Sequence, residues 1–172
     1  MRKDQNLGEY LRAQGVSRRG FLKFCSATAS LMALPPSAVA QVAEALASAR
    51  RPSVIWLSFQ ECTGCTESLT RSHAPTVESL IFDAISLDYH HTLQVAAGEG
   101  AENARMAAME ENDGEYLLVV DGSIPTGNPG FSTIAGISNL DMLKETARGA
   151  AAVIAVGTCA AFGGIPQAFP NP

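Results

Sequence analysis

Three cysteines carry the chemistry that this sequence offers. Cys62 and Cys65 stand three positions apart in the stretch Glu61-Cys62-Thr63-Gly64-Cys65, and Cys159 lies far downstream. Two thiols at this spacing can hold one metal centre or form one redox disulfide. The fourth cysteine, Cys25, lies in a predicted leader, so an odd number remains. Because a disulfide framework prefers an even number, the set favours a metal site with one ligand supplied from elsewhere.

Both cysteine segments follow apolar runs that are typical of buried strands. Residues 54–59 precede the pair, and residues 151–157 precede Cys159. In an open parallel sheet the carboxyl ends of the strands lie along one edge, where ligands bind. We therefore expect Cys62, Cys65 and Cys159 to converge at that edge, each in the loop that follows its strand.

The spacing alone leaves three kinds of site open. A structural zinc site needs four ligands, often as two Cys-x-x-Cys pairs, and the sequence has no second pair. A thioredoxin-like redox pair leaves Cys159 without a role. An iron–sulfur cluster uses thiolates and accepts irregular ligand spacing, so it is favoured over the other two.

The rest of the chain predicts a layered α/β domain. Apolar or alternating runs indicate strands, and Ala-rich or capped segments between them indicate helices. The strands are expected at about 53–59, 85–90, 115–121 and 151–157, and the helices at about 66–69, 75–84, 101–111 and 138–148. Residues 126–136 form a long Gly- and Pro-bearing loop, which is more often functional than incidental in a compact domain.

The N-terminal region has the order of a signal peptide. Ser17-Arg18-Arg19-Gly20-Phe21-Leu22-Lys23 precedes an apolar stretch from Phe24 to Leu34. Two small-x-small cleavage motifs follow, Ala38-Val39-Ala40 and Ala45-Leu46-Ala47. The paired arginines resemble a twin-arginine leader, which exports folded proteins; an ordinary secretory leader or a basic surface turn is the alternative. Residues 1 to about 16 are expected to be extended or weakly helical.

These features divide the chain into a leader at residues 1–47 and one domain at residues 48–172. The chain has 172 residues, a formal net charge of −5 and 47% hydrophobic residues, which suits one domain after removal of the leader. The mild acidity argues against a nucleic-acid surface, so no nucleic-acid partner is expected.

Four motifs, in order, resemble the small subunit of nickel–iron uptake hydrogenases. Together with the leader they cover nearly the whole chain, from about Ser17 to Pro172. The motifs are Glu61-Cys62-Thr63-Gly64-Cys65-Thr66-Glu67-Ser68, Ile85-Ser86-Leu87-Asp88-Tyr89, Val120-Asp121-Gly122-Ser123-Ile124-Pro125 and Gly157-Thr158-Cys159-Ala160-Ala161-Phe162-Gly163-Gly164.

The resemblance implies a flavodoxin-like parallel sheet with helices on both faces, truncated at the C-terminus. It implies that Cys62, Cys65 and Cys159 hold a proximal [4Fe-4S] cluster, with the fourth ligand beyond residue 172 and further iron–sulfur clusters in the missing part. The cluster would accept electrons from a large subunit that oxidises hydrogen at a nickel–iron site. A periplasmic location, association with the membrane and a membrane cytochrome b as a further partner are expected with it.

Two other functions remain as alternatives. One is the related iron–sulfur subunit of a quinone-reducing complex, although that family tends to place adjacent cysteines at the first motif. The other is a secreted, zinc-stabilised interaction module.

Several residues near the cysteines have more than one interpretation. The resemblance makes Glu61 and Thr63 neighbours of a proton path, whereas the simpler interpretation is that they hydrogen-bond the loop or the cluster. Asp121, at a strand end, either supports the ligands of the site or contacts a partner subunit, or it is part of the loop structure. His73 is expected in a turn, and one of His90 and His91 is expected to face solvent.

Overall fold

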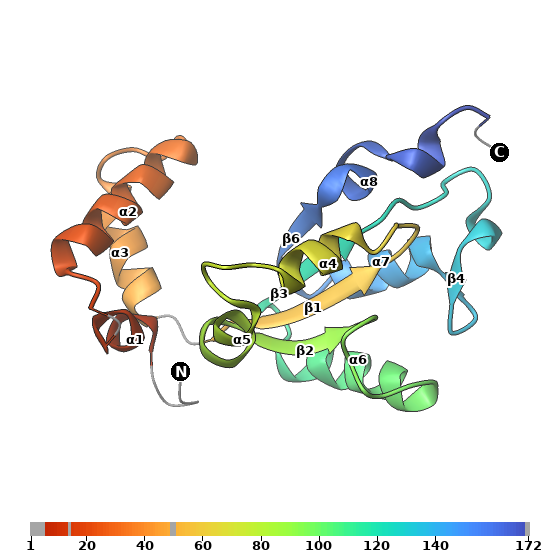
Figure 1. The fold of residues 1–172 in the computed structure, drawn as a ribbon, viewed down its shortest axis with the longest axis horizontal. Helices are drawn as coiled ribbons and strands as arrows, with labels where there is room; N and C mark the ends of the chain where they lie inside the picture. The colour runs from red at the N-terminus through yellow and green to blue at the C-terminus, as the bar shows by residue number, and fades with distance from the viewer. Residues whose placement is uncertain (1–5, 14, 49–50, 171–172) are drawn as a thin grey trace. The chain divides into compact units, whose positions relative to one another are not determined.

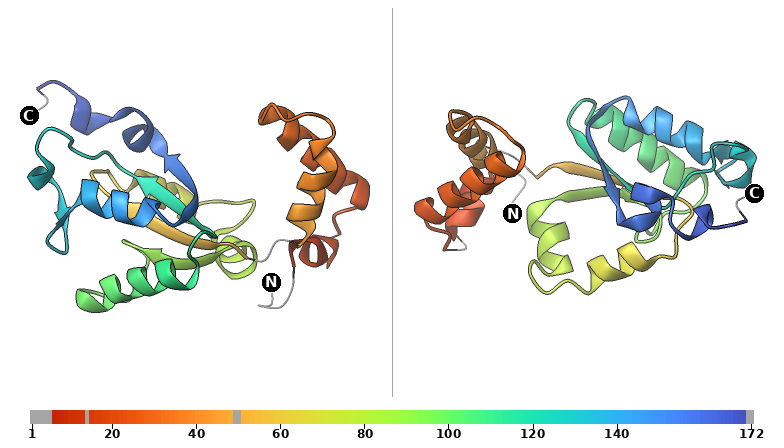
Figure 2. Two further views of the ribbon diagram at one scale, coloured as in Figure 1. Left: turned by 180° about the vertical axis from the view of Figure 1, so that it is seen from behind. Right: turned by 90° about the horizontal axis from the view of Figure 1, so that it is seen from above.

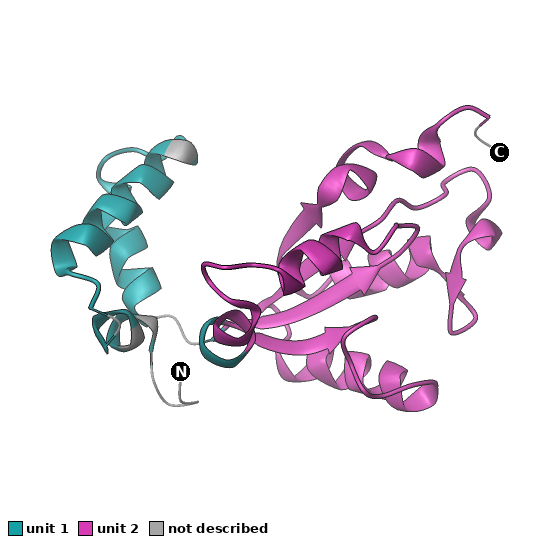
Figure 3. Cartoon of the chain, in the orientation of Figure 1, with its two compact units in different colours: residues 1–51, 82–84 teal, residues 52–81, 85–172 magenta. Residues whose placement is uncertain are grey.

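The computed structural model describes residues 6–13, 15–48 and 51–170. The chain forms two compact units, one of residues 1–51 with 82–84 and the other of residues 52–81 with 85–172 (Figure 3). The predictions for residues 1–5 and 14 lie outside the described residues.

The described residues of the N-terminal unit form the helices α1 (Leu7–Ala13), α2 (Arg18–Leu31) and α3 (Ala38–Ser48). The helix α2 begins after Ser17, whose extended backbone and side-chain oxygen cap it by accepting from the N–H of Gly20 at 3.1 Å. It ends before Pro35 and Pro36, which cannot continue a helix. Cys25 and Ala29 on α2 are buried, and α3 packs on this helix.

The N-terminal unit differs from the prediction in one respect. Residues 7–13 form a helix, where the sequence predicted an extended or weakly helical chain. A helix this short is marginal by itself, and contact of α1 with α3 explains its stability. Both predicted cleavage motifs lie within α3. Among the described residues, no helix combines the length and apolar character needed to cross a membrane.

The second unit is built on a four-stranded parallel sheet, as predicted. The strand order is β2-β1-β3-β6, and every neighbouring pair runs parallel (Figure 1). The strands are β1 (Ser53–Ser58), β2 (Ser86–His90), β3 (Tyr116–Asp121) and β6 (Ala150–Val156). Parallel pairing sends the carboxyl ends of all four strands to the same edge.

Helices cover both faces of this sheet, as Figure 2 shows. The helices α6 (Glu99–Glu111) and α7 (Asn139–Ala147) pack on one face, where Ala101, Ala108 and Met142 join the core. The helix α4 (Gly64–Thr70) contributes Leu69 to the apolar cluster of the other face. Alternate residues of β1 pack into the apolar clusters on the two faces of the sheet, so every residue of this strand is buried.

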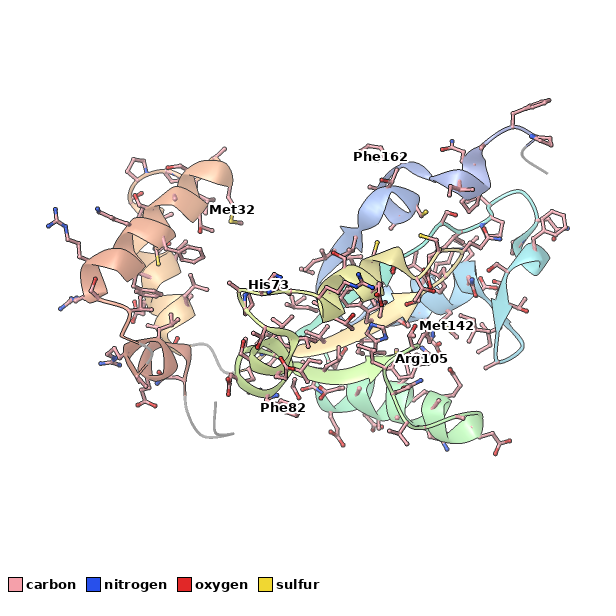
Figure 4. All side chains as sticks on the ribbon, viewed as in Figure 1. Met32, His73, Phe82, Arg105, Met142 and Phe162 are labelled. Carbon is pink, nitrogen blue, oxygen red and sulfur yellow. The ribbon has the colours of Figure 1, made fainter. Side chains whose placement is uncertain are left out.

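A buried arginine joins the two helices of the first face. The side chain of Arg105 on α6, labelled in Figure 4, is 1% exposed. Its guanidinium lies 3.0 Å from Glu102 and 3.0 Å from Glu145 of α7, and it donates to the hydroxyl of Thr146 at 3.0 Å. Because these groups satisfy a buried cation, the network fixes α6 against α7 and has a structural role.

Other segments differ in detail from the predictions. The predicted helix at 75–84 is a single turn, α5 (Val77–Ser79), followed by a π-helix, η1 (Leu80–Ala84). The long loop at 126–136 contains a 3-10 turn, η2 (Pro129–Phe131), and the first strand of a short hairpin, β4 (Thr133–Ile134) with β5 (Ile137–Ser138). A helix α8 (Gly157–Phe162) and a turn η3 (Ile165–Gln167) follow β6.

The two histidines at the end of β2 do not behave as expected, because neither is exposed. His90 is 1% exposed, and its ring stacks on Trp56 with 5.0 Å between centroids. Its Nδ1 accepts from the backbone N–H groups of Thr92 and Leu93, at 3.0 and 3.2 Å. His91 contacts the backbone of Ser58 through its own Nδ1. Backbone hydrogen bonds therefore hold both rings in place.

We predict that acid destabilises the fold through His90. Burial, and then the charge of His91, lower the pKa of His90 to about 4. The unfolded chain protonates this ring near pH 6.5 and the folded chain only near pH 4, so the stability that neutral His90 contributes is lost as pH falls through this window. The loss amounts to roughly 3 kcal/mol at most.

Urea unfolding at pH 7.5 and pH 5 measures this effect. The difference in free energy of unfolding between the two pH values should shrink in His90→Gln. The variant His73→Gln, which removes an exposed histidine, controls for the loss of an imidazole as such. An unchanged difference in His90→Gln would contradict the assignment.

Candidate metal centre

The candidate site lies at the carboxyl edge of the parallel sheet. Three neighbouring strands, β1, β3 and β6, end there. Cys62 lies in the loop after β1, Asp121 is the last residue of β3, and Cys159 comes shortly after β6. The sheet thus brings together segments that are far apart in the sequence, as the motif positions predicted.

The loop that carries Cys62 turns sharply into α4. Thr63 precedes this helix with a φ of 65°, a left-handed conformation that is unusual for a β-branched residue. The hydroxyl of Thr63 donates to a carboxylate oxygen of Glu61 at 3.3 Å. The turn places Cys65 in the first turn of α4 and leaves Cys62 in the loop before it.

Cys65 is the most constrained of the three thiols. Its thiol donates to the carbonyl oxygen of Val156 with 3.8 Å between Sγ and oxygen, and the carboxyl group of Asp121 lines the same cavity as Cys65. Burial raises the pKa of this thiol to about 11, and Asp121, Cys62 and Cys159 add to the rise. Because a metal binds the thiolate, cation binding at Cys65 must release a proton.

Two carboxyl groups lie beside the thiols. Asp121 is 1% exposed, and its Oδ2 has no hydrogen-bond partner. Burial raises the pKa of Asp121, and the hydrogen bond from Cys65 lowers it. Burial and the charge of Asp121 also raise the pKa of Glu61, against the hydrogen bond from Thr63. Asp121 is therefore a buried strand residue that lines the cavity beside the thiols.

All three cysteines open into one cavity of about 770 Å³. Its lining comes from the loop before α4, the end of β3, and α8 with the segment after it. The residues are Glu61, Cys62, Gly64, Cys65, Asp121, Gly157, Thr158, Cys159, Phe162, Gly164, Ile165 and Ala168. The structure therefore brings together the three predicted ligands and Glu61, whereas Thr63 is not among the lining residues.

One detail of the prediction is wrong. Cys159 lies inside the helix α8, and Cys65 lies inside α4, whereas the sequence placed both in loops. The helix α8 begins directly after β6 because Gly157 adopts a φ of +78° and turns the chain at once. Gly163 ends this helix in a left-handed conformation.

The donor set fits a thiolate-held cluster. Cys62, Cys65 and Cys159 are free thiols, and soft sulfur donors suit iron–sulfur clusters. Within the described ranges, no three His, Cys, Asp or Glu side chains are arranged to hold a single metal ion. Cys25 is buried in the N-terminal unit and lies outside this cavity.

A second cavity, of about 790 Å³, shares Phe162 with the first. Loop residues 123–127 and the segment after α8 line most of it. Large apolar side chains that line the two cavities are exposed: Phe131 of the second cavity by 57%, Ile165 of the first by 78%, and the shared Phe162 by 78%. Exposed apolar surface of this extent is typical of an interaction face.

Comparison with known proteins identifies the family to which this chain belongs. Residues 62–172 match the model of the family described as NADH ubiquinone oxidoreductase, 20 Kd subunit. The chain is 46% identical over 163 residues to the hydrogenase-2 small chain of Escherichia coli K12, covering 94% of this chain and 44% of that protein. It is 48% identical over 159 residues to the periplasmic [NiFe] hydrogenase small subunit of Solidesulfovibrio fructosivorans, covering 92% of this chain and 50% of that protein.

Solved structures agree with these relatives. The fold is similar to a chain of the [NiFeSe] hydrogenase of Desulfomicrobium baculatum, with a TM-score of 0.68 and 32% identity over 72% of this chain and 48% of that one. The [NiFeSe] hydrogenase of Desulfovibrio vulgaris Hildenborough has a TM-score of 0.67 and 38% sequence identity, over 73% of this chain and 46% of that one. The chain thus spans about half the length of the curated relatives it matches.

Proposed function

The chain belongs to the family described as NADH ubiquinone oxidoreductase, 20 Kd subunit, and it is similar to small subunits of nickel–iron hydrogenases. We propose that it carries electrons away from a hydrogen-oxidising site. The observation that supports this proposal most directly is the convergence of Cys62, Cys65 and Cys159 on one cavity at the sheet edge. Hydrogenase small subunits are iron–sulfur proteins, and the thiols suit such a group.

In this proposal Cys62, Cys65 and Cys159 hold a proximal [4Fe-4S] cluster. A fourth ligand, and further iron–sulfur clusters, come from the part of a longer protein that the curated relatives possess. When bound, the cluster supplies a one-electron carrier whose potential depends on hydrogen bonds to sulfur and on burial. The chain itself orients the thiolates and excludes water from one side of the cavity.

Glu61 and Thr63 have a more limited role in the proposal. Thr63 donates a hydrogen bond to Glu61, and Glu61 lines the cavity. The two residues therefore either lie beside a proton path or stabilise the loop that carries Cys62. The catalytic metal itself belongs to the partner, and no residue of this chain is proposed to activate hydrogen.

The proposed partner is a hydrogenase large subunit. Phe162 and Ile165, which line the cavity and are exposed, offer apolar surface for such a partner. A dry contact there would shorten electron transfer to the cluster and protect it from solvent. A membrane cytochrome b as a further partner and attachment to the membrane remain parts of the proposal.

We also propose that the protein works in the periplasm after export by the twin-arginine pathway. Relatives named as periplasmic support the location. In this proposal residues 1–47 are the leader and residues 48–172 are the processed domain. In the structure, the boundary between the two compact units falls between residues 51 and 52 of the sequence. Arg18 and Arg19 are exposed at the start of α2, where a receptor can reach them.

Metal analysis tests the proposed function. The protein, produced with its large subunit, should contain iron and acid-labile sulfide, and should reduce a dye with hydrogen as the only electron donor. Zinc without sulfide would instead indicate the secreted interaction module. Reduction by a nicotinamide in place of hydrogen would indicate the quinone-reducing complex, which the hydrogenase relatives disfavour.

A further inference from the structure

Each of the three thiols in the cavity lies against a glycine. A Cβ atom placed on Gly157 would lie 2.3 Å from the Sγ of Cys65. A Cβ on Gly164 would lie 2.5 Å from the Sγ of Cys159, and one on Gly64 would lie 3.1 Å from the Sγ of Cys62. Contacts below 3.0 Å are essentially never found for real Cβ atoms. The absence of a side chain at Gly157 and Gly164 therefore makes room for sulfur.

The contact of Gly157 joins the two cysteine segments. Gly157 belongs to the segment that carries Cys159, yet it touches the sulfur of Cys65 from the other segment. The preceding residue, Val156, places its carbonyl oxygen 3.8 Å from the same sulfur. This carbonyl accepts the hydrogen bond of the Cys65 thiol. The Cys65 sulfur thus packs against Val156 and Gly157, at the end of β6.

We propose that Gly157 is a positioning residue that sets the place of the Cys65 sulfur, and that Gly164 does the same for Cys159. One part of this inference rests on the proposed function, namely that correctly placed thiolates retain an iron–sulfur cluster. The sulfur contacts themselves belong to the described fold. A methyl group at either position must push its sulfur away or distort the turn that carries it.

The chain contains matched controls for both glycines. Gly157 and Gly136 share a φ of +78°, and Gly136 has no atom within 4 Å of its ideal Cβ. Gly164 and Gly98 have φ values of +57° and +59°, and the Cβ position of Gly98 is equally open. The members of each pair share their φ, so a difference between them reports the contacts of the added Cβ. For Gly157 the close contact is the Cys65 sulfur, and for Gly164 it is the Cys159 sulfur together with the Cα of Cys159 at 2.8 Å.

The first test measures cluster retention in the complex with the large subunit. We expect Gly157→Ala to weaken iron binding on the order of tenfold to 100-fold, with a changed electron paramagnetic resonance signal of the reduced cluster. Gly136→Ala should keep its iron and its signal. The same contrast is expected between Gly164→Ala and Gly98→Ala. Equal iron loss within a pair, or an unchanged signal in Gly157→Ala, would overturn the proposal.

The second test needs no metal and keeps the inference separate from the proposed function. In the metal-free chain, thermal unfolding is compared for Gly157→Ala, Cys65→Ala and the double variant. Because Cys65→Ala removes the obstructing sulfur, Gly157→Ala should lower the unfolding temperature by less in that background. Gly136→Ala should be additive with Cys65→Ala. Additivity of Gly157→Ala with Cys65→Ala would show that the sulfur is not what the glycine accommodates.

Discussion

Replacing Cys159 by alanine should leave the complex without its proximal cluster and stop hydrogen-dependent dye reduction. Cys159 is the single cysteine on the β6 side of the cavity, whereas Cys62 and Cys65 both come from the β1 side. With the thiolate of Cys159 removed, the cluster would be held from one side only. Iron per protein should fall on the order of tenfold or more, because even residues that only support a metal ligand contribute at this scale.

The control for this experiment is another cysteine of the same chain. Cys25 is fully buried in the N-terminal unit and does not line the cavity, so in the unprocessed precursor complex, which still carries residues 1–47, Cys25→Ala should retain iron and hydrogen-dependent activity. Iron and sulfide are measured on the purified complex, together with the rate of dye reduction under hydrogen. A Cys159→Ala complex with a full complement of iron would refute the assignment of this residue as a ligand.

Changing Arg18 and Arg19 together to lysine should keep the protein in the cytoplasm. Both side chains are exposed at the first turn of α2, next to the cap formed by Ser17. A guanidinium presents a rigid planar fork of donors that an ammonium cannot reproduce, so a receptor that reads arginine should not accept lysine. Periplasmic antigen and activity should fall to background, and unprocessed precursor should accumulate.

A second basic residue of the leader provides the matched control. Arg12→Lys makes the same chemical change on α1, outside the twin-arginine motif, and should export normally. Cell fractionation with a marker enzyme for each compartment measures the outcome. Undiminished periplasmic activity in Arg18→Lys/Arg19→Lys would refute the twin-arginine interpretation. The fold and the cysteine site would be unaffected by that result, because they belong to the other unit.

Much of the architecture could be predicted because it is encoded by local pattern. Apolar runs, helix caps and glycines mark strands and helices without reference to distant residues. The alternation of these elements implied a parallel sheet, and the sheet implied a common edge for Cys62, Cys65 and Cys159. Both implications are confirmed by the strand order and by the shared cavity.

Features that depend on the relation between distant segments were visible only in the tertiary structure. The glycines around Cys159 are evident in the sequence, but nothing in their spacing shows that Gly157 meets the sulfur of Cys65. Likewise, the burial of His90 depends on Trp56 from the neighbouring strand. Cys159 lies in α8 because the chain turns at Gly157 and a helix follows directly. From the sequence alone, either a helix or a loop could follow such a turn.

The sequence by itself therefore determined which groups could do chemistry and at which edge of the sheet they meet. The tertiary structure decided which atoms touch within that edge: Asp121 with Cys65, Val156 with Cys65, and Gly157 with Cys65. The physical reason is that side-chain periodicity fixes the type and direction of an element over a few residues. Contacts across the sheet, in contrast, are set by strand register and by the turn that leaves each strand, and these depend on the packing of the whole domain.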